Sequence, residues 1–189
     1  MKTMKNKLIV FDVDETIGAF SSFAGLCDQV SPYRTTMQLF AHLLDQNPSF
    51  LRPKILDILS FVKHNKMLGR CQVALYTNNQ GPNQWVNFIK TYLESKLDYP
   101  LFDHVVRAYK VNGVHVEKKR TRHEKCLNDL LACTNCHSTT KIFFVDDQVH
   151  EEMIKPSVHY FRIRPYDCPK SDVEPSQKLM QHLVQFLQS

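Results

Sequence analysis

A chain of 189 residues is long enough to bury a sizeable core and has the size of one domain, so we expect a single domain over 1–189. Its 43% hydrophobic and 23% charged residues argue against a disordered, fibrous or membrane-embedded protein. The net charge of +5 is modest, and it favours an anionic substrate without indicating nucleic acid.

The start of the chain is basic, but the apolar run after it stops at Asp12, too soon for a signal peptide, and no run reaches transmembrane length. The six cysteines are scattered. Cys133 and Cys136, followed by His137, resemble half of a zinc site, yet no second half is present. We therefore expect reduced thiols, no membrane partner, and a soluble, intracellular protein of the cytoplasm or nucleus.

Residues 7–11, Lys-Leu-Ile-Val-Phe, predict a buried strand, because the run is apolar and too short for a helix. The strand ends at Asp12, and Asp14 follows two residues later. Ligands of open α/β sheets bind at the carboxyl ends of strands, where both carboxylates would lie. Such a pair is tolerable when a divalent cation neutralises it or one group holds a proton, which suggests Mg²⁺. An Asp-rich turn without function is the alternative.

The segment 18–50 predicts a small helical insertion after this strand. Ser31-Pro32 is typical of a helix start, and the helix should end near Asn47-Pro48. Its apolar residues recur at helical spacing: Met37, Phe40, Leu43 and Leu44. The insertion is well placed to cover the site, or it merely packs against the sheet.

A helix is predicted over 53–65 and a second strand over 71–76. The strand ends in a polar cluster, 77–81, before a helix that begins near Asn83 and has an apolar face led by Trp85. A hydroxyl and amides at a helix start can cradle an oxyanion or phosphate. The same residues are also ordinary in loops.

Residues 103–109 predict a third strand, and Asn112-Gly113 between β-formers predicts a hairpin near 109–117. A basic cluster comes next: Lys118, Lys119, Arg120, Arg122, His123 and Lys125. It could be a nuclear localisation signal or a polyanion-binding patch. We favour a solvated helix start with one functional lysine turned inward and the other residues exposed.

Residues 141–145 predict a fourth strand, which ends in Asp146 and Asp147. This second acidic pair strengthens the metal hypothesis, because two strands would bring carboxylates to one edge of a parallel sheet. A fifth strand over 159–164 and a C-terminal helix that starts near 171–175 complete the pattern. The predicted class is α/β, with a Rossmann-like three-layer fold and a central, mostly parallel sheet.

Four groups of residues, met in this order, resemble the four motifs of the haloacid dehalogenase (HAD) superfamily of phosphohydrolases: Asp12-Val-Asp14-Glu-Thr16, Thr77, a lysine before a helix, and Asp146-Asp147. Leu51-Arg52-Pro53 is similar to the branch of RNA polymerase II C-terminal-domain phosphatases and nuclear-LIM-interactor-interacting-factor-like phosphatases. The stretches 144–150 and 163–166 resemble members of that branch from large DNA viruses, which would place the protein in a host cell. The likeness spans nearly the whole chain.

The resemblance implies a HAD-like fold and covalent phosphoryl transfer. Asp12 would attack phosphorus to form an aspartyl phosphate, and Asp14 would protonate the leaving oxygen and then take a proton from water. Mg²⁺ would be held by the Asp12 carboxylate, the Asp14 main-chain carbonyl, and Asp146 with Asp147. Of the last two, we expect Asp147 to be the nearer ligand.

The remaining predicted site residues would contact the phosphoryl group or the substrate: Thr77, a lysine, Asn78 and Thr16. Lys125 heads the helix before the fourth strand, where the family keeps its lysine, so we choose it over Lys118 and Lys119.

The implied activity is Mg²⁺-dependent phosphomonoester hydrolysis, with phosphoserine or phosphothreonine in protein as the favoured substrate. The branch carries a β insert where this insertion is predicted to be helical, and 77–81 also resembles polynucleotide 3′-phosphatases and histidinol phosphatases. A polynucleotide end or a small metabolite is therefore the alternative, with nucleic acid possible but not favoured. A non-catalytic interaction protein is third, and Asp14 argues against it. The sequence contains nothing that resembles a nucleotide-binding P-loop, which argues against a coupled kinase.

Overall fold

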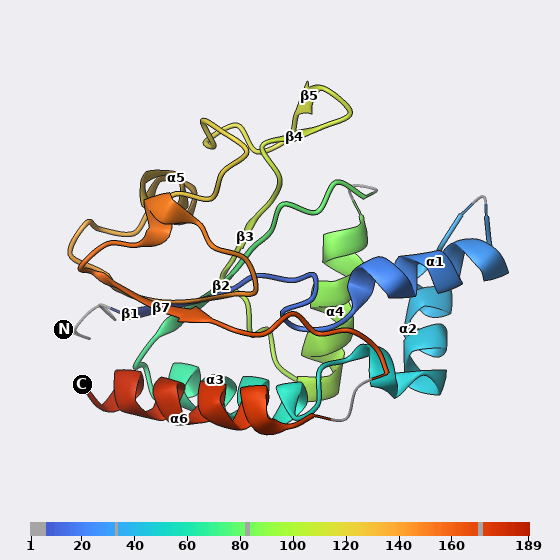
Figure 1. Cartoon of the computed structure of the whole chain (residues 1–189), viewed down its shortest axis with the longest axis horizontal. Coiled ribbons are helices and arrows are strands. Elements are labelled where there is room, and N and C mark those ends of the chain that lie inside the picture. The colour runs from blue at the N-terminus through green and yellow to red at the C-terminus, as the bar shows by residue number, and fades with distance from the viewer. Residues whose placement is uncertain (1–6, 33, 82–83, 170–171) are drawn as a thin grey trace.

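The computed structural model describes residues 7–32, 34–81, 84–169 and 172–189. A five-stranded parallel sheet with the order β3–β2–β1–β6–β7 forms its centre (Figure 1). The strands are β1 (Lys7–Phe11), β2 (Gln72–Tyr76), β3 (His104–Val106), β6 (Lys141–Asp146) and β7 (Val158–Arg162). The predicted α/β class with a parallel central sheet is confirmed.

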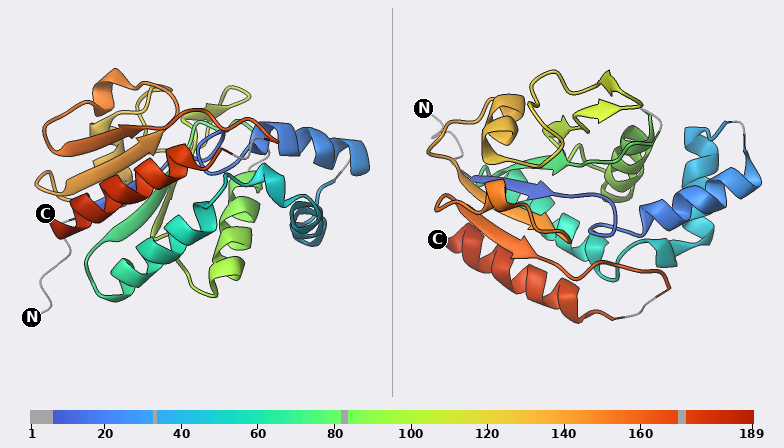
Figure 2. Two further views of the ribbon diagram at one scale, coloured as in Figure 1. Left: turned by 60° about the horizontal axis from the view of Figure 1, so that its bottom comes forward. Right: turned by 45° about the horizontal axis from the view of Figure 1, so that its top comes forward.

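Helices cover both faces of the sheet (Figure 2). One face carries α3 (Ile55–Met67), α4 (Trp85–Leu97) and α6 (Glu174–Gln188), and the other carries α5 (Leu127–Thr134). In β1, Ile9 and Phe11 join the core under the three helices, whereas Leu8 and Val10 join the core under α5. Both faces of β1 are buried, which explains its uninterrupted apolar sequence.

The segment 18–50 contains α1 (Phe20–Val30), α2 (Met37–Gln46) and the short 3-10 helix η1 (Pro48–Phe50), which stand beyond the end of β1 (Figure 1). The helix start predicted at Ser31-Pro32 is wrong. The first helix ends at Val30, and α2 begins after Thr36, whose hydroxyl accepts a hydrogen bond from the Leu39 N–H at 3.2 Å. A threonine cap therefore sets the start of α2.

The two ends of this insertion meet at one point. The Ala19 N–H donates to the Phe50 carbonyl at 2.8 Å, and the Arg52 N–H donates to the Ile17 carbonyl at 3.0 Å. A Cβ atom on Gly18 would lie 2.6 Å from the Phe50 carbonyl oxygen. Only glycine permits so close a backbone approach, so Gly18 allows the neck of the insertion to close.

Aromatic rings pack the insertion against α4. The Phe40 ring lies 5.1 Å from Trp85 at an interplanar angle of 79° and 5.7 Å from Phe88, measured between centroids. One polar link accompanies them, in which Asp45 accepts hydrogen bonds from the Tyr92 hydroxyl and the Lys96 ammonium, both at 2.7 Å. The insertion is thus fixed mainly by ring packing.

The predicted hairpin is confirmed as an antiparallel pair, β4 (Lys110–Val111) and β5 (Val114–His115). The third strand, predicted over 103–109, is shorter, because the backbone leaves the sheet after Val106. The Val106 carbonyl accepts the last hydrogen bond there, from the Thr77 N–H. The fifth strand was predicted over 159–164, but its pairing with β6 covers 158–162.

The helix start predicted near Asn83 lies outside the described residues, within which α4 begins at Trp85. The C-terminal helix α6 begins at Glu174, inside the predicted range 171–175, of which Ser171 lies outside the described residues. A further short 3-10 helix, η2, covers Glu151–Met153. Among the described residues, no helix combines the length and apolar character that crossing a bilayer requires.

Candidate functional site

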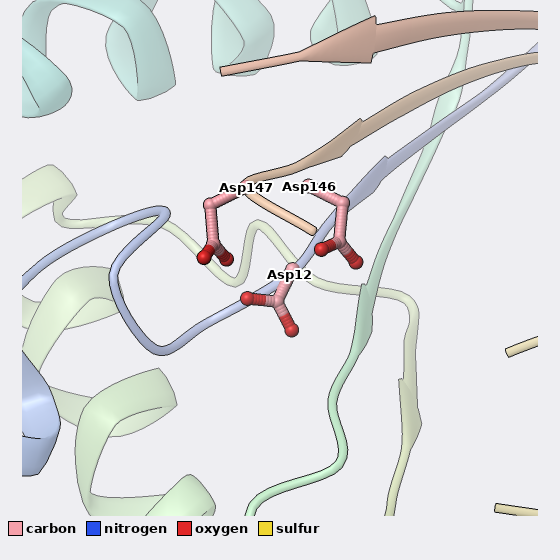
Figure 3. Close-up of side chains that lie close together, drawn as sticks. All are labelled: Asp12, Asp146 and Asp147. Carbon is pink, nitrogen blue, oxygen red and sulfur yellow. The ribbon is translucent and has the colours of Figure 1, made fainter. Parts of the chain in front are cut away.

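Two neighbouring strands bring carboxylates to one edge of the sheet. Asp12 follows β1, Asp146 ends β6 and Asp147 comes next. Because Phe11 pairs with Val145, the strands end in register, and carboxylate oxygens of the three aspartates lie within 4.8 Å of one another (Figure 3). Within the described ranges, this is the only group of three acidic, histidine or cysteine side chains close enough to share a metal ion.

Lys125 neutralises part of this cluster. Its side chain is buried at 2% exposure, and Nζ donates to Asp146 Oδ2 at 2.7 Å and to Asp12 Oδ1. The two competing lysines are exposed on the surface, where Lys119 donates to the Asn135 side chain instead. Of the three candidates, only Lys125 reaches the carboxylates.

Burial and charge act against each other at these groups. Burial raises the pKa of Asp12, and the Lys125 ammonium opposes that rise. Burial would also raise the pKa of Asp146, but His150 and Lys125 outweigh it and hold the pKa below its usual range. Three carboxylates face one ammonium, so with all three carboxylates ionised the edge would carry an excess of negative charge that suits a cation.

Asp147 is oriented by Thr16, whose hydroxyl donates to Asp147 Oδ1 at 3.2 Å. Buried Arg52 holds the loop that carries Thr16, because its guanidinium donates to the Thr16 carbonyl at 2.6 Å and to the carbonyls of Glu15 and Arg164, both at 2.7 Å. Burial lowers the pKa of Arg52 to about 10, so it stays charged near neutral pH. From sequence alone, Arg52 was assigned no role beyond its place in a resemblance.

Asp14 is not part of the three-carboxylate cluster, and its side chain contacts Asn79. The Asn79 side-chain amide donates to both Asp14 oxygens, at 2.9 and 3.1 Å, and its carbonyl oxygen accepts from the Gly81 N–H at 2.9 Å. Burial raises the pKa of Asp14, and the bond from Asn79 opposes that rise. Asp14 is thus a carboxyl group that is oriented separately from the other three.

The loop after β2 is tied down by Arg120. The Thr77 hydroxyl accepts from the Asn79 N–H at 3.0 Å, and the Asn78 side-chain oxygen accepts from Arg120 at 2.8 Å. Arg120 also donates to the carbonyls of Arg107 and His123, at 2.9 and 2.7 Å. With 1% exposure, Arg120 contradicts the prediction that the basic cluster is exposed apart from one lysine. Its guanidinium satisfies carbonyl groups of three loops.

His150 is a site residue that the sequence did not reveal. Its Nε2 lies 3.3 Å from Asp146 Oδ2, and its Nδ1 lies 2.8 Å from Glu124 Oε1. His150 is 4% exposed and lines the same cavity as Asp146, which its ring contacts. The sequence signals were its place four residues after Asp146 and within the stretch 144–150 quoted for the resemblance, and neither assigned it a role.

A cavity of about 240 Å³ opens onto these groups, with Asp12, Asp14 and Lys125 among its lining residues. A carboxylate nucleophile, a second carboxyl group and an ammonium that face one cavity can together transfer a group to and from a carboxylate. No protein-family model matches the chain, and no curated protein matches its sequence.

Proposed function

We propose that this chain is a Mg²⁺-dependent phosphomonoester hydrolase of the HAD type that acts through an aspartyl phosphate on Asp12. One observation carries the proposal: Asp12 contacts Lys125 beside Asp146 and Asp147, while Asp14 stands apart on Asn79. The division separates a nucleophile in a charged cluster from a carboxyl group that can hold a proton.

The residues present fit a magnesium ion. Mg²⁺ prefers hard oxygen ligands, and buried carboxylates of Asp12, Asp146 and Asp147 offer them within 4.8 Å of one another. The Asp14 main-chain carbonyl would complete the set of protein ligands. When bound, the ion would offset the negative charge of the phosphoryl group.

The chain's own residues account for the covalent steps. An Asp12 oxygen attacks phosphorus, the bond from phosphorus to the ester oxygen breaks, and Asp14 gives its proton to that oxygen. Asp14 then removes a proton from water, which attacks the phosphorus of the aspartyl phosphate and releases phosphate and free Asp12. Lys125 and the Thr77 hydroxyl bind phosphoryl oxygens during both steps.

The resemblance favours phosphoserine or phosphothreonine in protein as the substrate. A second candidate is a nucleotide end or a small phosphorylated metabolite. It is favoured by a second cavity, of about 390 Å³, which is lined by residues of the segment 18–50 and α4 and shares Ser21 and Asn79 with the catalytic cavity. A cavity beside the catalytic groups offers room for a compact leaving group.

Release of phosphate from an aryl phosphate, measured with and without Mg²⁺, tests the chemistry. Asp12→Asn should abolish turnover, because an amide is a far weaker nucleophile than a carboxylate. Asp57→Asn is the matched control, because that carboxylate is exposed on α3 and paired with Lys54 at the surface. Folded protein, judged by circular dichroism, that shows no metal-dependent turnover would contradict the proposal.

A further inference from the structure

Among the described residues that line the catalytic cavity, Glu15 is the one carboxylate that the proposed mechanism does not use. Asp12, Asp14 and Asp146 line the same cavity, and each would take part in phosphoryl transfer or hold the metal ion. Glu15 follows Asp14 directly in the chain and is partly exposed. A substrate that enters the cavity can therefore contact it.

The backbone at Glu15 has a conformation that favours glycine. Its φ angle of 54° lies in the left-handed region, where a Cβ atom is crowded by the backbone. The Glu15 N–H donates to the Gly18 carbonyl at 2.8 Å, and the Glu15 carbonyl accepts from the Tyr166 N–H at 2.8 Å and from Arg52 at 2.7 Å. Residues held in such conformations cluster at functional sites. Because glycine would suit this backbone better, the strain points to a role for the glutamate side chain.

Two carboxyl groups flank the boundary between the catalytic cavity and the second cavity. The residues that both cavities share are Ser21 and Asn79. Asn79 donates to Asp14 at 2.9 Å, and Ser21 forms hydrogen bonds with the Glu15 carboxylate. Asp14 would protonate the leaving oxygen, so the leaving group must face this side of the cavity. Glu15 is thus placed to contact the leaving group.

Within the described lining of the catalytic cavity, no cationic side chain is left to pair with Glu15. Lys125 and His150 each contact other carboxylates, and the exposed residues of the basic cluster do not line this cavity. Burial raises the pKa of Glu15, but hydrogen bonds from Ser21 favour the ionised carboxylate and oppose that rise. A carboxylate in this position attracts a cation on the leaving group and repels an anion.

We propose that Glu15 is a specificity-determining residue, which selects phosphomonoesters whose leaving group carries a positive charge close to the phosphate. The proposal rests on the proposed function above, because it concerns the leaving group of that reaction. Arginine or lysine beside a phosphoserine supplies such a charge, and so does the amine of a small phosphorylated metabolite. Attraction in one case and repulsion in the other should together give a selectivity of about tenfold or more.

Two phosphoserine peptides that differ only in their flanking residues, arginine in one and glutamate in the other, test this selectivity. For the wild type, we expect kcat/KM for the arginine peptide to exceed that for the glutamate peptide by about tenfold or more, mainly through KM. Glu15→Gln should lower this ratio by about tenfold. Asp57→Asn makes the same change in net charge at an exposed position of α3 and should leave the ratio unchanged.

Glu15→Gly separates a role of the side chain in selectivity from a role in folding. Glycine adopts the φ angle of 54° without strain, so this variant should melt no lower than the wild type. It should still lose the selectivity as fully as Glu15→Gln does. A glutamate that served folding alone would give the opposite result, a lower melting temperature with an unchanged ratio.

Binding to the Asp12→Asn variant distinguishes this proposal from the proposed function, because it requires no turnover. Fluorescently labelled forms of the two peptides, followed by anisotropy, should bind with the arginine peptide tighter by about tenfold. Adding Glu15→Gln should remove most of this difference. If the wild type hydrolyses no phosphoester, the proposed function fails, whereas the order of affinities still decides the role of Glu15.

Phosphoethanolamine and ethyl phosphate, which differ by one amine, identify the source of the charge in the same assays. Selectivity for the arginine peptide assigns a protein substrate. Selectivity for phosphoethanolamine alone, removed by Glu15→Gln, assigns a small metabolite. Equal kcat/KM and equal affinity within both pairs, or a selectivity that Glu15→Gln leaves unchanged, would overturn the proposal.

Discussion

Charged side chains at the edge of the sheet are held by ion pairs and hydrogen bonds, whereas the insertion 18–50 is held by aromatic rings. At the edge, Lys125 contacts Asp12 and Asp146 with almost no exposure to water. In the insertion, Phe40 packs on Trp85, and Asp45 provides the polar link. Stability at the edge should therefore depend on charge and metal, and stability of the insertion should not.

Lys125→Met should have the largest effect, because it leaves buried carboxylates without their counter-charge. We expect turnover to fall by roughly a thousandfold and the free energy of unfolding to fall by about 3–5 kcal/mol without Mg²⁺, but by less with it. Urea unfolding in both conditions measures the difference. Lys119→Met, at an exposed position, should change the free energy of unfolding by less than about 0.5 kcal/mol. If Lys125→Met lowered the free energy of unfolding equally with and without Mg²⁺, the contrast between the edge and the insertion would be refuted.

Phe40→Ala tests the packing of the insertion instead. Removing a fully buried ring should lower the free energy of unfolding by about 3 kcal/mol, and by the same amount with and without Mg²⁺. The same urea experiment measures it. The half-exposed neighbour Leu39 is the control, and Leu39→Ala should cost clearly less. A strong dependence of the Phe40→Ala effect on Mg²⁺ would show that the two regions are coupled.

Gly81→Ala should disturb the orientation of Asp14 while changing the free energy of unfolding little. The added Cβ would lie 2.9 Å from the Asn79 side-chain oxygen, so the amide that holds Asp14 must move. We expect turnover to fall by about tenfold and the free energy of unfolding to change by less than about 1 kcal/mol. In Gly25→Ala, on α1, the added Cβ meets nothing within 4 Å, and turnover should stay at the wild-type level. Steady-state assays of both variants check this, and unchanged turnover in Gly81→Ala would speak against a role for Asn79.

Asp45→Asn should have the smallest effect, and the effect should depend on pH. Hydrogen bonds from Lys96 and Tyr92 hold the pKa of Asp45 below its usual range, so the folded state binds its proton less readily than the unfolded state does. The stabilisation is complete above the ordinary pKa of about 4 and is lost as the pH falls through the lower folded value. The side chain is 46% exposed, so we expect less than about 1 kcal/mol at neutral pH. Melting temperatures of wild type and variant should differ near neutral pH and converge in acid.

The strands and their acidic ends could be predicted because the signal is local. Each central strand is a short apolar run, and Asp12 or Asp146 follows or ends it directly. The same holds for the hairpin at Asn112-Gly113, where both residues have positive φ angles of 50° and 79°. Such features depend on neighbours in the sequence, so one chain suffices to find them.

Residues that act between loops could not be predicted. Arg120 contacts Asn78 across 42 positions of the chain, and His150 contacts Glu124 across 26. Asn78 and Asn79 are chemically alike. Only the backbone conformation of the loop decides that Asn79 contacts Asp14 and Asn78 contacts Arg120. These choices follow from tertiary structure, which periodicity and spacing do not encode.

The closed neck at Gly18 makes the insertion an exchangeable module. The Ile17 carbonyl and the Arg52 N–H are bonded to each other outside the segment 18–50, so we expect strand register to tolerate a change in its length. Lengthening such a loop costs little closure entropy, roughly 0.6 kcal/mol for each doubling. One wall of the second cavity can therefore diverge, or be replaced by grafting, while the carboxylates on β1 and β6 keep their positions.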